Sequence, residues 1–179
     1  ASARVFGDSM LERTSASVVV ERLGAAARRQ PESTTLVHRG WHALMFTERE
    51  QHSLESLARR ARKLGRRPDG LNQLGDHMIF VAKAHLERIT LEAFIAGIQA
   101  CSDDDARAVL ERLCSLYALS SIHADRGWFA EHGKISAARS KAIGAQLTAL
   151  CAELRPDALA LVEGLGIPAD WLGAALLES

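Results

Sequence analysis

The sequence has few of the residues that interrupt helices or build β-sheets. Only 4 of its 179 residues are proline, and β-branched residues form a single short run, Val18 to Val20. Proline breaks helices, and β-branched residues favour strands. No alternation of polar and apolar residues persists along the chain, so a half-buried sheet is excluded. The sequence therefore predicts an all-α protein.

Cysteine is also scarce, with only Cys101, Cys114 and Cys151. No two of them form a CxxC pair, which excludes a zinc ribbon and a thioredoxin-like redox motif. An odd number of widely spaced cysteines is typical of a reducing compartment. Cys114 and Cys151 lie among leucines and alanines, so we expect both to be small core residues.

Net charge and long apolar runs are missing as well. The chain has 22 Lys and Arg residues against 22 Asp and Glu residues. A balanced charge gives no strong field for nucleic acid or for anionic membranes. No apolar run approaches the roughly 20 residues of a membrane span. The first residues show neither a signal-peptide pattern nor an initiator Met, so we expect a trimmed chain or a piece of a longer one.

One local excess of charge is the basic run 59–67, which contains six arginine and lysine residues. We interpret it as a solvated helix end, because cations favour helix C-termini. The alternative is a patch that binds the phosphates of a nucleotide or of coenzyme A.

Prolines, glycines and capping residues divide the chain into helix-forming segments. Helices are expected over residues 9–28, from Thr34 or Thr35 to 64, over 71–100, from the cap Ser102 to 131, from the cap Ser136 to 154, from Pro156 onward, and over 169–177. Short connections predict an antiparallel bundle of about six helices. Residues 1–179 are expected to form a single domain.

The segment 71–100 is the most informative of these helices. At 100° per residue its polar side chains fall on two separate stripes. One stripe holds Asp76, Lys83, Glu87 and Thr90, the other His77, His85, Arg88, Glu92 and Gln99, and the residues between them include Ile79, Val81, Leu86, Ile89, Phe94, Ile95 and Ile98. Such a helix contacts neighbours on two sides, which predicts a central position.

Two neighbouring helices carry simpler patterns. Residues 104–115 have one narrow polar face of Asp104, Arg107, Glu111 and Ser115. The segment 136–154 has a single apolar stripe, expected to be buried, of Ile143, Leu147, Leu150, Cys151 and Leu154. Together these patterns predict an antiparallel bundle with short connections.

Four side chains at helical spacing are candidates for a metal site. His38 and His42 are four residues apart, and so are Glu48 and His52. A zinc or iron site needs three or four converging ligands, and neither HExxH nor the paired ExxH motif of di-iron bundles occurs. The alternative is that these are surface or interface histidines that flank Trp41. The sequence assigns no metal site.

His85 and the run Asp103 to Asp105 are candidates for chemistry of other kinds. His85 is either a hydrogen-bonded structural histidine or a general base, but no Ser, Cys or Asp partner is indicated by spacing. The three aspartates either bind a cation or occupy the first turn of a helix, where the dipole favours anions. Neither a glycine-rich phosphate loop nor a serine nucleophile motif occurs. No catalytic residue is assigned.

Three ordered blocks nevertheless resemble a known family. The first is DH at 76–77, AKAHL at 82–86 and LEAF at 91–94; the second is AVLERLCSLYAL at 108–119 with WFAEHG at 128–133; the third is LCAELRPDA at 150–158 with LVE at 161–163, GIP at 166–168 and WL at 171–172. In this order they resemble the C-terminal helical domain of acyl-CoA oxidases. The stretch 46–60 is similar to the bacterial, actinobacterial-like members.

The resemblance implies a flavoenzyme that oxidises an acyl-CoA to the trans-2-enoyl-CoA with FAD, and passes the electrons to dioxygen to form hydrogen peroxide. It implies that the catalytic glutamate and the FAD-binding segments lie on preceding domains that this chain lacks. Glu48, Glu50, Glu87 and Glu163 are therefore not assigned that role. No cofactor-binding residue is assigned, and no cofactor is expected for this chain alone.

The chain departs from the family pattern at two places. It has Leu161-Val162-Glu163-Gly164-Leu165 where the family often has Leu-Val-Asp-Ala-Phe, and glycine disfavours the helix there. It ends in Leu177-Glu178-Ser179 instead of the peroxisomal address Ser-Lys-Leu. From this end we expect a bacterial, cytoplasmic protein.

Two hypotheses of different class follow. The first is a non-catalytic module that associates with the catalytic, flavin-binding domains or chain of an acyl-CoA oxidase and supports a homodimer of the parent enzyme. An exposed Trp41, Trp128 or Trp171 would then mark the docking face. The second is a stand-alone helical ligand-binding or scaffold domain, such as the effector domain of a regulator. Neither hypothesis includes binding to nucleic acid or membrane.

Overall fold

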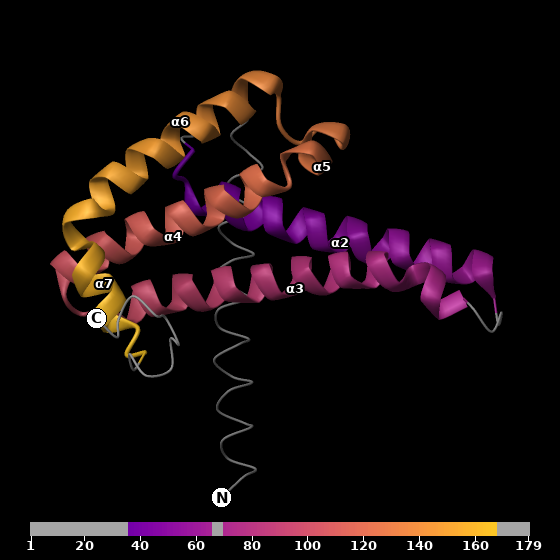
Figure 1. Ribbon diagram of the computed structural model, residues 1–179, viewed down its shortest axis with the longest axis horizontal. Helices are drawn as coiled ribbons and strands as arrows, with labels where there is room; N and C mark the ends of the chain where they lie inside the picture. Colours follow the sequence, from indigo (N-terminus) through magenta and orange to yellow (C-terminus); the bar gives the residue numbers. More distant parts are fainter. Residues whose placement is uncertain (1–35, 66–69, 168–179) are drawn as a thin grey trace, which may run out of the picture.

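The computed structural model describes residues 36–65 and 70–167, and the chain in these ranges is helical, with no strand (Figure 1). The elements are α2 (Arg39–Leu64), α3 (Gly70–Ala100), α4 (Asp104–Ala124), α5 (Arg126–Glu131), α6 (Ala137–Leu154), the 3-10 turn η1 (Arg155–Asp157) and α7 (Ala158–Gly164). The predicted all-α helical bundle is confirmed. The expected helices 9–28 and 169–177 lie outside the described residues.

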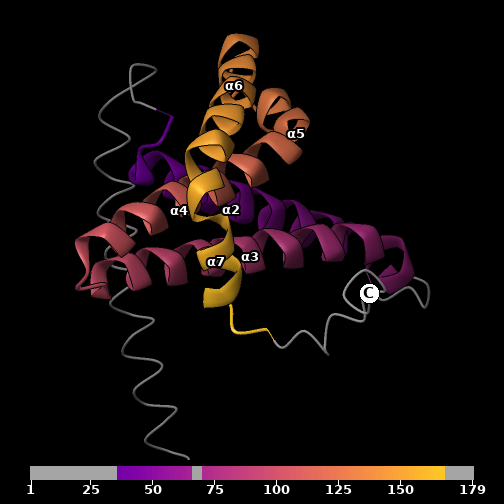
Figure 2. The same ribbon diagram turned by 60° about the vertical axis from the view of Figure 1, so that its left-hand side comes forward.

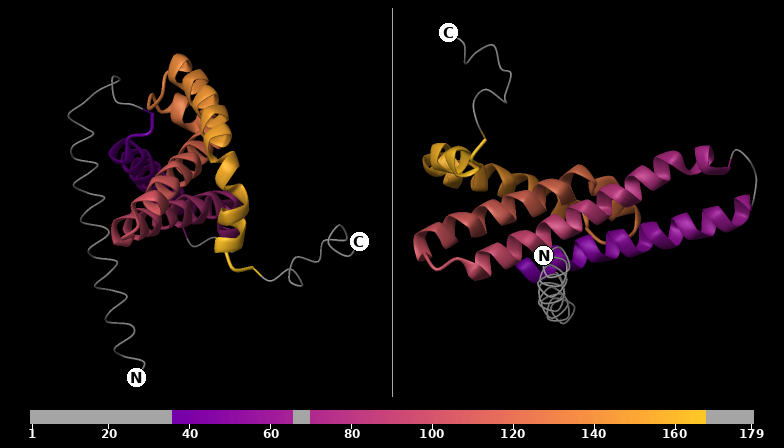
Figure 3. Two further views of the ribbon diagram at one scale, coloured as in Figure 1. Left: turned by 90° about the vertical axis from the view of Figure 1, so that its left-hand side faces the viewer. Right: turned by 90° about the horizontal axis from the view of Figure 1, so that it is seen from below.

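A long antiparallel hairpin of α2 and α3 forms the base of the molecule (Figure 1). Seen from below, its connected end extends past the other helices (Figure 3). α4 also packs on α3, so α3 has helical neighbours on two sides. The predicted central position of α3 is confirmed.

The second half of the chain covers α4. α6 packs on α4 and slants away from the hairpin, and the short α5 turns the chain between them (Figure 2). After η1, α7 packs on this turn. The result is a layered bundle in which α4 lies between the hairpin and α6.

Capping residues set the ends of α2 and α6. α2 begins at Arg39, not just after Thr34 or Thr35, because the His38 ring caps it by accepting a hydrogen bond from the Trp41 amide at 3.3 Å. It ends at Leu64, and the following Gly65 has a φ of 60°, which suits glycine, as the sequence predicted. The predicted cap of α6 is also confirmed, since the Ser136 hydroxyl accepts from the Arg139 amide at 3.1 Å.

Two other predicted boundaries are wrong. The cap of α4 is Asp103, not Ser102, and its carboxylate accepts from the Ala106 amide at 2.8 Å. The helix expected to reach residue 131 ends at Ala124, and α5 starts after Asp125. Asp125 leaves the helical conformation, with φ −98° and ψ 22°, and its carboxylate bonds to side chains of α2 and α3. A tertiary contact therefore accompanies this break, which local propensity does not reveal.

The core lies where α2, α3, α4 and α6 meet. Its buried members include Phe46, Leu91, Ile95, Ile98, Cys114, Ala118, Leu119, Ile122, Phe129, Ile143 and Leu150. Cys114 is a core residue as predicted, but Cys151 is exposed. Cys151 lies 100° around α6 from Leu150, at the edge of the stripe that faces α4, and solvent reaches it.

Candidate functional site

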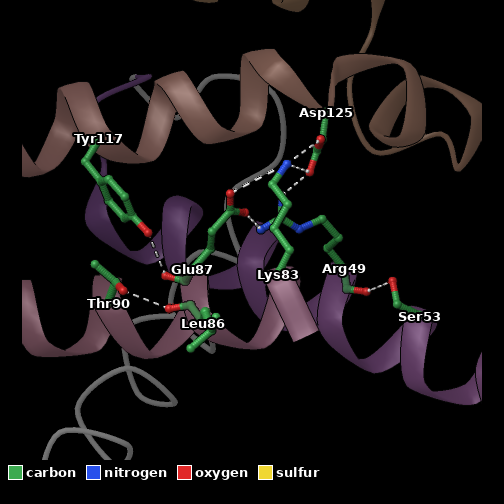
Figure 4. Close-up of polar contacts among 8 residues, drawn as sticks. All are labelled: Arg49, Ser53, Lys83, Leu86, Glu87, Thr90, Tyr117 and Asp125. Atoms are coloured by element: carbon green, nitrogen blue, oxygen red, sulfur yellow. Dashed lines mark hydrogen bonds and ion pairs between the residues drawn. The ribbon is translucent and has the colours of Figure 1, made fainter. Parts of the chain in front are cut away.

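The most conspicuous polar feature is an ion cluster at the crossing of α2, α3 and the α4–α5 corner (Figure 4). We call Arg49, Lys83, Glu87 and Asp125 the Arg49 cluster. The fully buried Arg49 guanidinium donates one hydrogen bond to Asp125 at 2.5 Å and another to Glu87. Lys83 Nζ lies 3.1 Å from Asp125 and 3.7 Å from Glu87. Two cations thus meet two carboxylates.

Neighbouring groups fix the cluster in place. The Tyr117 hydroxyl donates to the backbone oxygen of Glu87 at 3.1 Å, and the Ser53 hydroxyl donates to the backbone oxygen of Arg49 at 2.6 Å (Figure 4). The Arg49 guanidinium carbon lies 5.1 Å from the ring centre of Phe46 and 5.7 Å from that of Phe129. Such cation–π contacts stabilise a guanidinium that has left water.

Burial of an unpaired arginine would cost several kcal/mol, so the carboxylates are a condition for this fold. Each carboxylate accepts from at least one cation, which leaves neither Glu87 nor Asp125 as a free base. The Arg49 cluster therefore acts as a lock between three elements. It is not the arrangement of a catalytic acid and base.

A second charged group joins α2 to the other polar stripe of α3. Glu50 accepts from the His85 ring at 2.6 Å and from Arg88, which also bonds to Glu92. Burial lowers the pKa of Arg88, but its hydrogen bond to Glu50 and the charge of Glu92 outweigh this effect and raise the pKa above its usual value. Both polar stripes of α3 are thus bound by consecutive residues of α2, Arg49 and Glu50.

His85 is hydrogen-bonded, as the structural interpretation required, although its side chain is 52% exposed. Its partner is a carboxylate that Arg88 also holds. The structure therefore favours a structural histidine.

The four candidate metal ligands do not converge. His38 caps α2, Glu48 pairs with Lys134 at 2.9 Å, and His52 packs on the rings of Trp128 and His132. Over residues 36–65 and 70–167, no three His, Cys, Asp or Glu side chains are grouped in a way that would hold a metal ion.

His42 is buried in the core, which corrects the expectation of a surface or interface histidine. Its Nε2 bonds to the backbone oxygen of Leu36 at 2.6 Å. Burial lowers the pKa of His42 to about 4, against an opposing effect of that hydrogen bond. The ring is therefore neutral at pH 7 and donates from Nε2.

The remaining candidates are helix-end charges. Asp103 caps α4 and Asp104 pairs with Arg107 at 2.6 Å, so the helix-start interpretation of the three aspartates is confirmed. Arg62 and Lys63 are exposed in the last turn of α2, which confirms the solvated helix end for that part of the basic run. Arg66 and Arg67 lie outside the described residues.

Exposed apolar side chains gather on two helices. On α3, Ile79 is 70% exposed and Leu86 is 58% exposed, and Ala82 and Ala93 lie on the same face. On and just after α7, four large aliphatic side chains are exposed: Leu159, Val162, Leu165 and Ile167. Exposed apolar groups of this size mark candidate docking faces.

The expected markers of docking are wrong in part. Trp41 is buried beneath the guanidinium of Arg139, at 4.2 Å, and Trp128 is half-buried against His132. Trp171 lies outside the described residues. Ile79 and Leu86 need the opposite correction, because the two-stripe pattern placed them between packed neighbours and both are exposed.

Arg49 was not indicated by any motif. One signal was available: on α2 it follows Met45 and Phe46 and precedes Ser53 at helical spacing, and these residues are all buried. A charged residue inside an apolar stripe predicts a buried ion pair, but its partners on two other elements are not readable from local sequence.

The helices of the described residues include none with both the length and the hydropathy to cross a membrane.

Comparison with known proteins matches the chain to one protein family. Residues 43–177 match the family model described as acyl-CoA oxidase. The acyl-coenzyme A oxidase-like protein of Mus musculus is 32% identical over 97 residues, which cover 54% of this chain and 15% of that protein. The peroxisomal acyl-coenzyme A oxidase 2 of Arabidopsis thaliana is 29% identical over 126 residues, which cover 69% of this chain and 18% of that protein. No solved structure matches the chain significantly.

Two further facts follow from these matches. The chain spans less than a fifth of the length of these curated relatives. The expected bacterial, cytoplasmic location is contradicted, because relatives from Arabidopsis thaliana, Mus musculus and Rattus norvegicus are named peroxisomal enzymes. That expectation rested on three residues, whereas the likeness to the peroxisomal enzymes extends over most of the chain.

Proposed function

We propose, since this chain belongs to the acyl-CoA oxidase family, that it is the C-terminal helical module of such an oxidase. In this proposal it performs no chemistry of its own. It docks on the flavin-bearing part of the enzyme, which converts an acyl-CoA to the trans-2-enoyl-CoA and reduces dioxygen to hydrogen peroxide. The whole of residues 1–179 belongs to this module.

One observation carries the proposal: the family match extends over residues 43–177, and the charged groups buried there are bound to one another. Glu50, Glu87 and Asp125 each bind a cation, so none of the three offers a free carboxylate to a substrate. The matched residues cover only 15% and 18% of the two relatives, which leaves ample chain elsewhere for catalysis.

The faces of α3 and α7 give the module a way to attach. Burial of Ile79 and Leu86 at a contact would stabilise it by roughly 1.5–3 kcal/mol per side chain, relative to leaving both in water. Alanines on the same face allow a partner helix to approach closely. We therefore assign α3 as the main contact with the flavin-bearing part and α7 as a second contact.

In this proposal the described residues do not hold the flavin. A dinucleotide needs unpaired donors for its pyrophosphate, often at a glycine-rich helix start. The buried Arg49 and the partly buried Arg88 are instead neutralised by carboxylates. We therefore place the FAD on the other domains or chain, and support of a homodimer through the docked module is part of the same proposal.

The test is reconstitution in trans. The flavin-bearing part of a family member is co-expressed with this chain, and flavin absorbance is followed through size-exclusion chromatography. The two are expected to elute together, with oxidase activity in the shared peak. Ile79→Asp with Leu86→Asp should abolish co-elution, because two carboxylates on α3 would have to be desolvated at the contact.

Thr148→Asp is the matched control, since Thr148 is exposed on α6, away from the assigned faces. It should leave co-elution unchanged, and circular dichroism checks that each variant stays helical. Stoichiometric FAD and turnover in the isolated chain would overturn the proposal. Stabilisation of the isolated chain by an acyl-CoA, with no association with the flavin-bearing part, would favour the stand-alone ligand-binding alternative.

A further inference from the structure

Three aromatic rings lie in mutual contact where α5 meets α2, and the proposed function does not use them. We call His52, Trp128 and His132 the histidine–tryptophan cluster. The His132 ring stacks on the Trp128 ring, with centroids 4.1 Å apart and an angle of 19° between the planes. The His52 ring contacts the His132 ring edge-on, with centroids 4.3 Å apart and an angle of 76°. His52 also contacts Trp128 at 5.6 Å. All three side chains are half-buried.

α5 depends on such contacts. It has only six residues, Arg126–Glu131, and no side chain caps its first turn. A helix of this length is not stable by itself in water. It is held by the buried Phe129, by the stacked rings and by a bond from the His132 ring to the backbone oxygen of Trp128 at 2.7 Å.

That bond fixes where His132 takes up a proton. Because a backbone oxygen only accepts, Nδ1 of His132 carries hydrogen in this contact. A second proton would then enter at Nε2 and make the ring cationic. A cationic ring stacked on indole is favourable, so one charge is compatible with the cluster.

Two charges are not compatible with it. The other charges around His52 are paired with each other. On α2, Arg59 pairs with Glu55 at 3.9 Å. Lys134, which follows α5, pairs with Glu48 of α2 at 2.9 Å. Of these neighbours only Glu55 favours a charged His52, and its effect is smaller than those of burial, His132 and Arg59. Two cationic rings with centroids 4.3 Å apart would repel each other. Burial, and then the charge of His132, lower the pKa of His52 accordingly.

We propose that the histidine–tryptophan cluster makes the attachment of α5 to α2 sensitive to pH. α5 is bound while at most one of the two imidazoles is charged, and it detaches when both are. Since α5 starts directly after Asp125, its detachment also loosens the corner that carries one partner of Arg49.

The sign of the effect follows from linkage. His52 binds its proton less readily in the folded chain than in the unfolded one. Attachment is therefore complete above the ordinary histidine pKa of about 6.5 and weakens as pH falls below it.

The test compares amide hydrogen-exchange protection in α5 with that in α6 of the same sample, at about pH 7.5 and about pH 5. Protection factors correct for the intrinsic pH dependence of exchange. The ratio of α5 to α6 protection should fall by roughly tenfold or more in the natural chain. Acid destabilisation of the whole bundle lowers both helices together, so it does not change the ratio.

His52→Phe keeps a ring against His132 and removes one of the two charges. In this variant the ratio should be nearly independent of pH. If packing of the phenylalanine disturbs the fold, as circular dichroism would reveal, the reciprocal His132→Phe should give the same flat ratio. A constant ratio in the natural chain, or an equal fall in a folded variant, would overturn the proposal.

Discussion

The guanidinium of Arg49 on α2 donates a hydrogen bond at 2.5 Å to the carboxylate of Asp125, 76 residues later at the α4–α5 corner. This contact joins the first described helix to the point where the second half of the chain turns back. The same guanidinium bonds to Glu87 on α3. A single buried side chain therefore connects three elements that are far apart in the sequence.

Removal of the Arg49 charge should destabilise the fold severely. Arg49→Met keeps much of the side-chain volume but leaves Glu87 and Asp125 with only the exposed end of Lys83. Breaking a buried pair on one side costs about 3–5 kcal/mol. The free energy of unfolding, from urea titration, should fall by that amount.

Arg59→Met is the control for this measurement, because Arg59 forms an exposed i,i+4 pair at 3.9 Å with Glu55. Its cost should stay below about 0.5 kcal/mol. Equal and small losses in both variants would show that the Arg49 cluster does not lock the helices.

Acid should destabilise the bundle through His42. The pKa of its buried ring is about 4 in the folded chain, against 6.5 for an ordinary histidine. Because the unfolded chain binds the proton more readily, the contribution is complete above pH 6.5 and is lost as pH falls to about 4. The loss is on the order of 3 kcal/mol.

His42→Phe should flatten this pH dependence, which urea titrations at several pH values measure. His52 acts in the same direction, so the comparison is made in a His52→Phe background. Thr148→Ala, at an exposed position on α6, serves as the control and should leave the slope in place. A slope that survives the His42 substitution would contradict the assignment.

Thiol reactivity should separate the cysteines. Cys114 is fully buried, and burial raises the pKa of its thiol to about 11. Cys151 is exposed. At pH 8, N-ethylmaleimide should modify Cys151 within minutes and Cys114 only at the rate of unfolding, because the thiolate is the nucleophile. Mass spectrometry of peptides measures how fast each cysteine is modified. Fast labelling of Cys114 would contradict the described core.

The cap of α6 should make a measurable contribution. Ser136→Ala removes the acceptor of the Arg139 amide, at a cost of about 1 kcal/mol. Ser120→Ala, at an exposed position within α4, should be neutral or slightly stabilising because alanine favours helices. A thermal unfolding midpoint that falls equally for the two variants would show that the serine at the cap has no special role.

Part of the fold could be predicted because its causes are local. Residues within a single turn or a single helix are enough to specify the cap Ser136, the terminal Gly65 and the two polar stripes of α3. The break at Asp125 and the exposure of Cys151 could not be predicted in this way. In both cases the outcome depends on which other helix lies alongside, and helical periodicity does not specify the partner.

The sequence alone determined the all-α class, most helix ends and the likeness to acyl-CoA oxidases, since periodicity, capping and ordered residue blocks are properties of the chain itself. Only the tertiary structure decided that Arg49 joins α3 and the α4–α5 corner, that His42 is neutral in the core, and that His52 meets His132. Burial and charge pairing depend on distances between segments, which are fixed when the helices pack together.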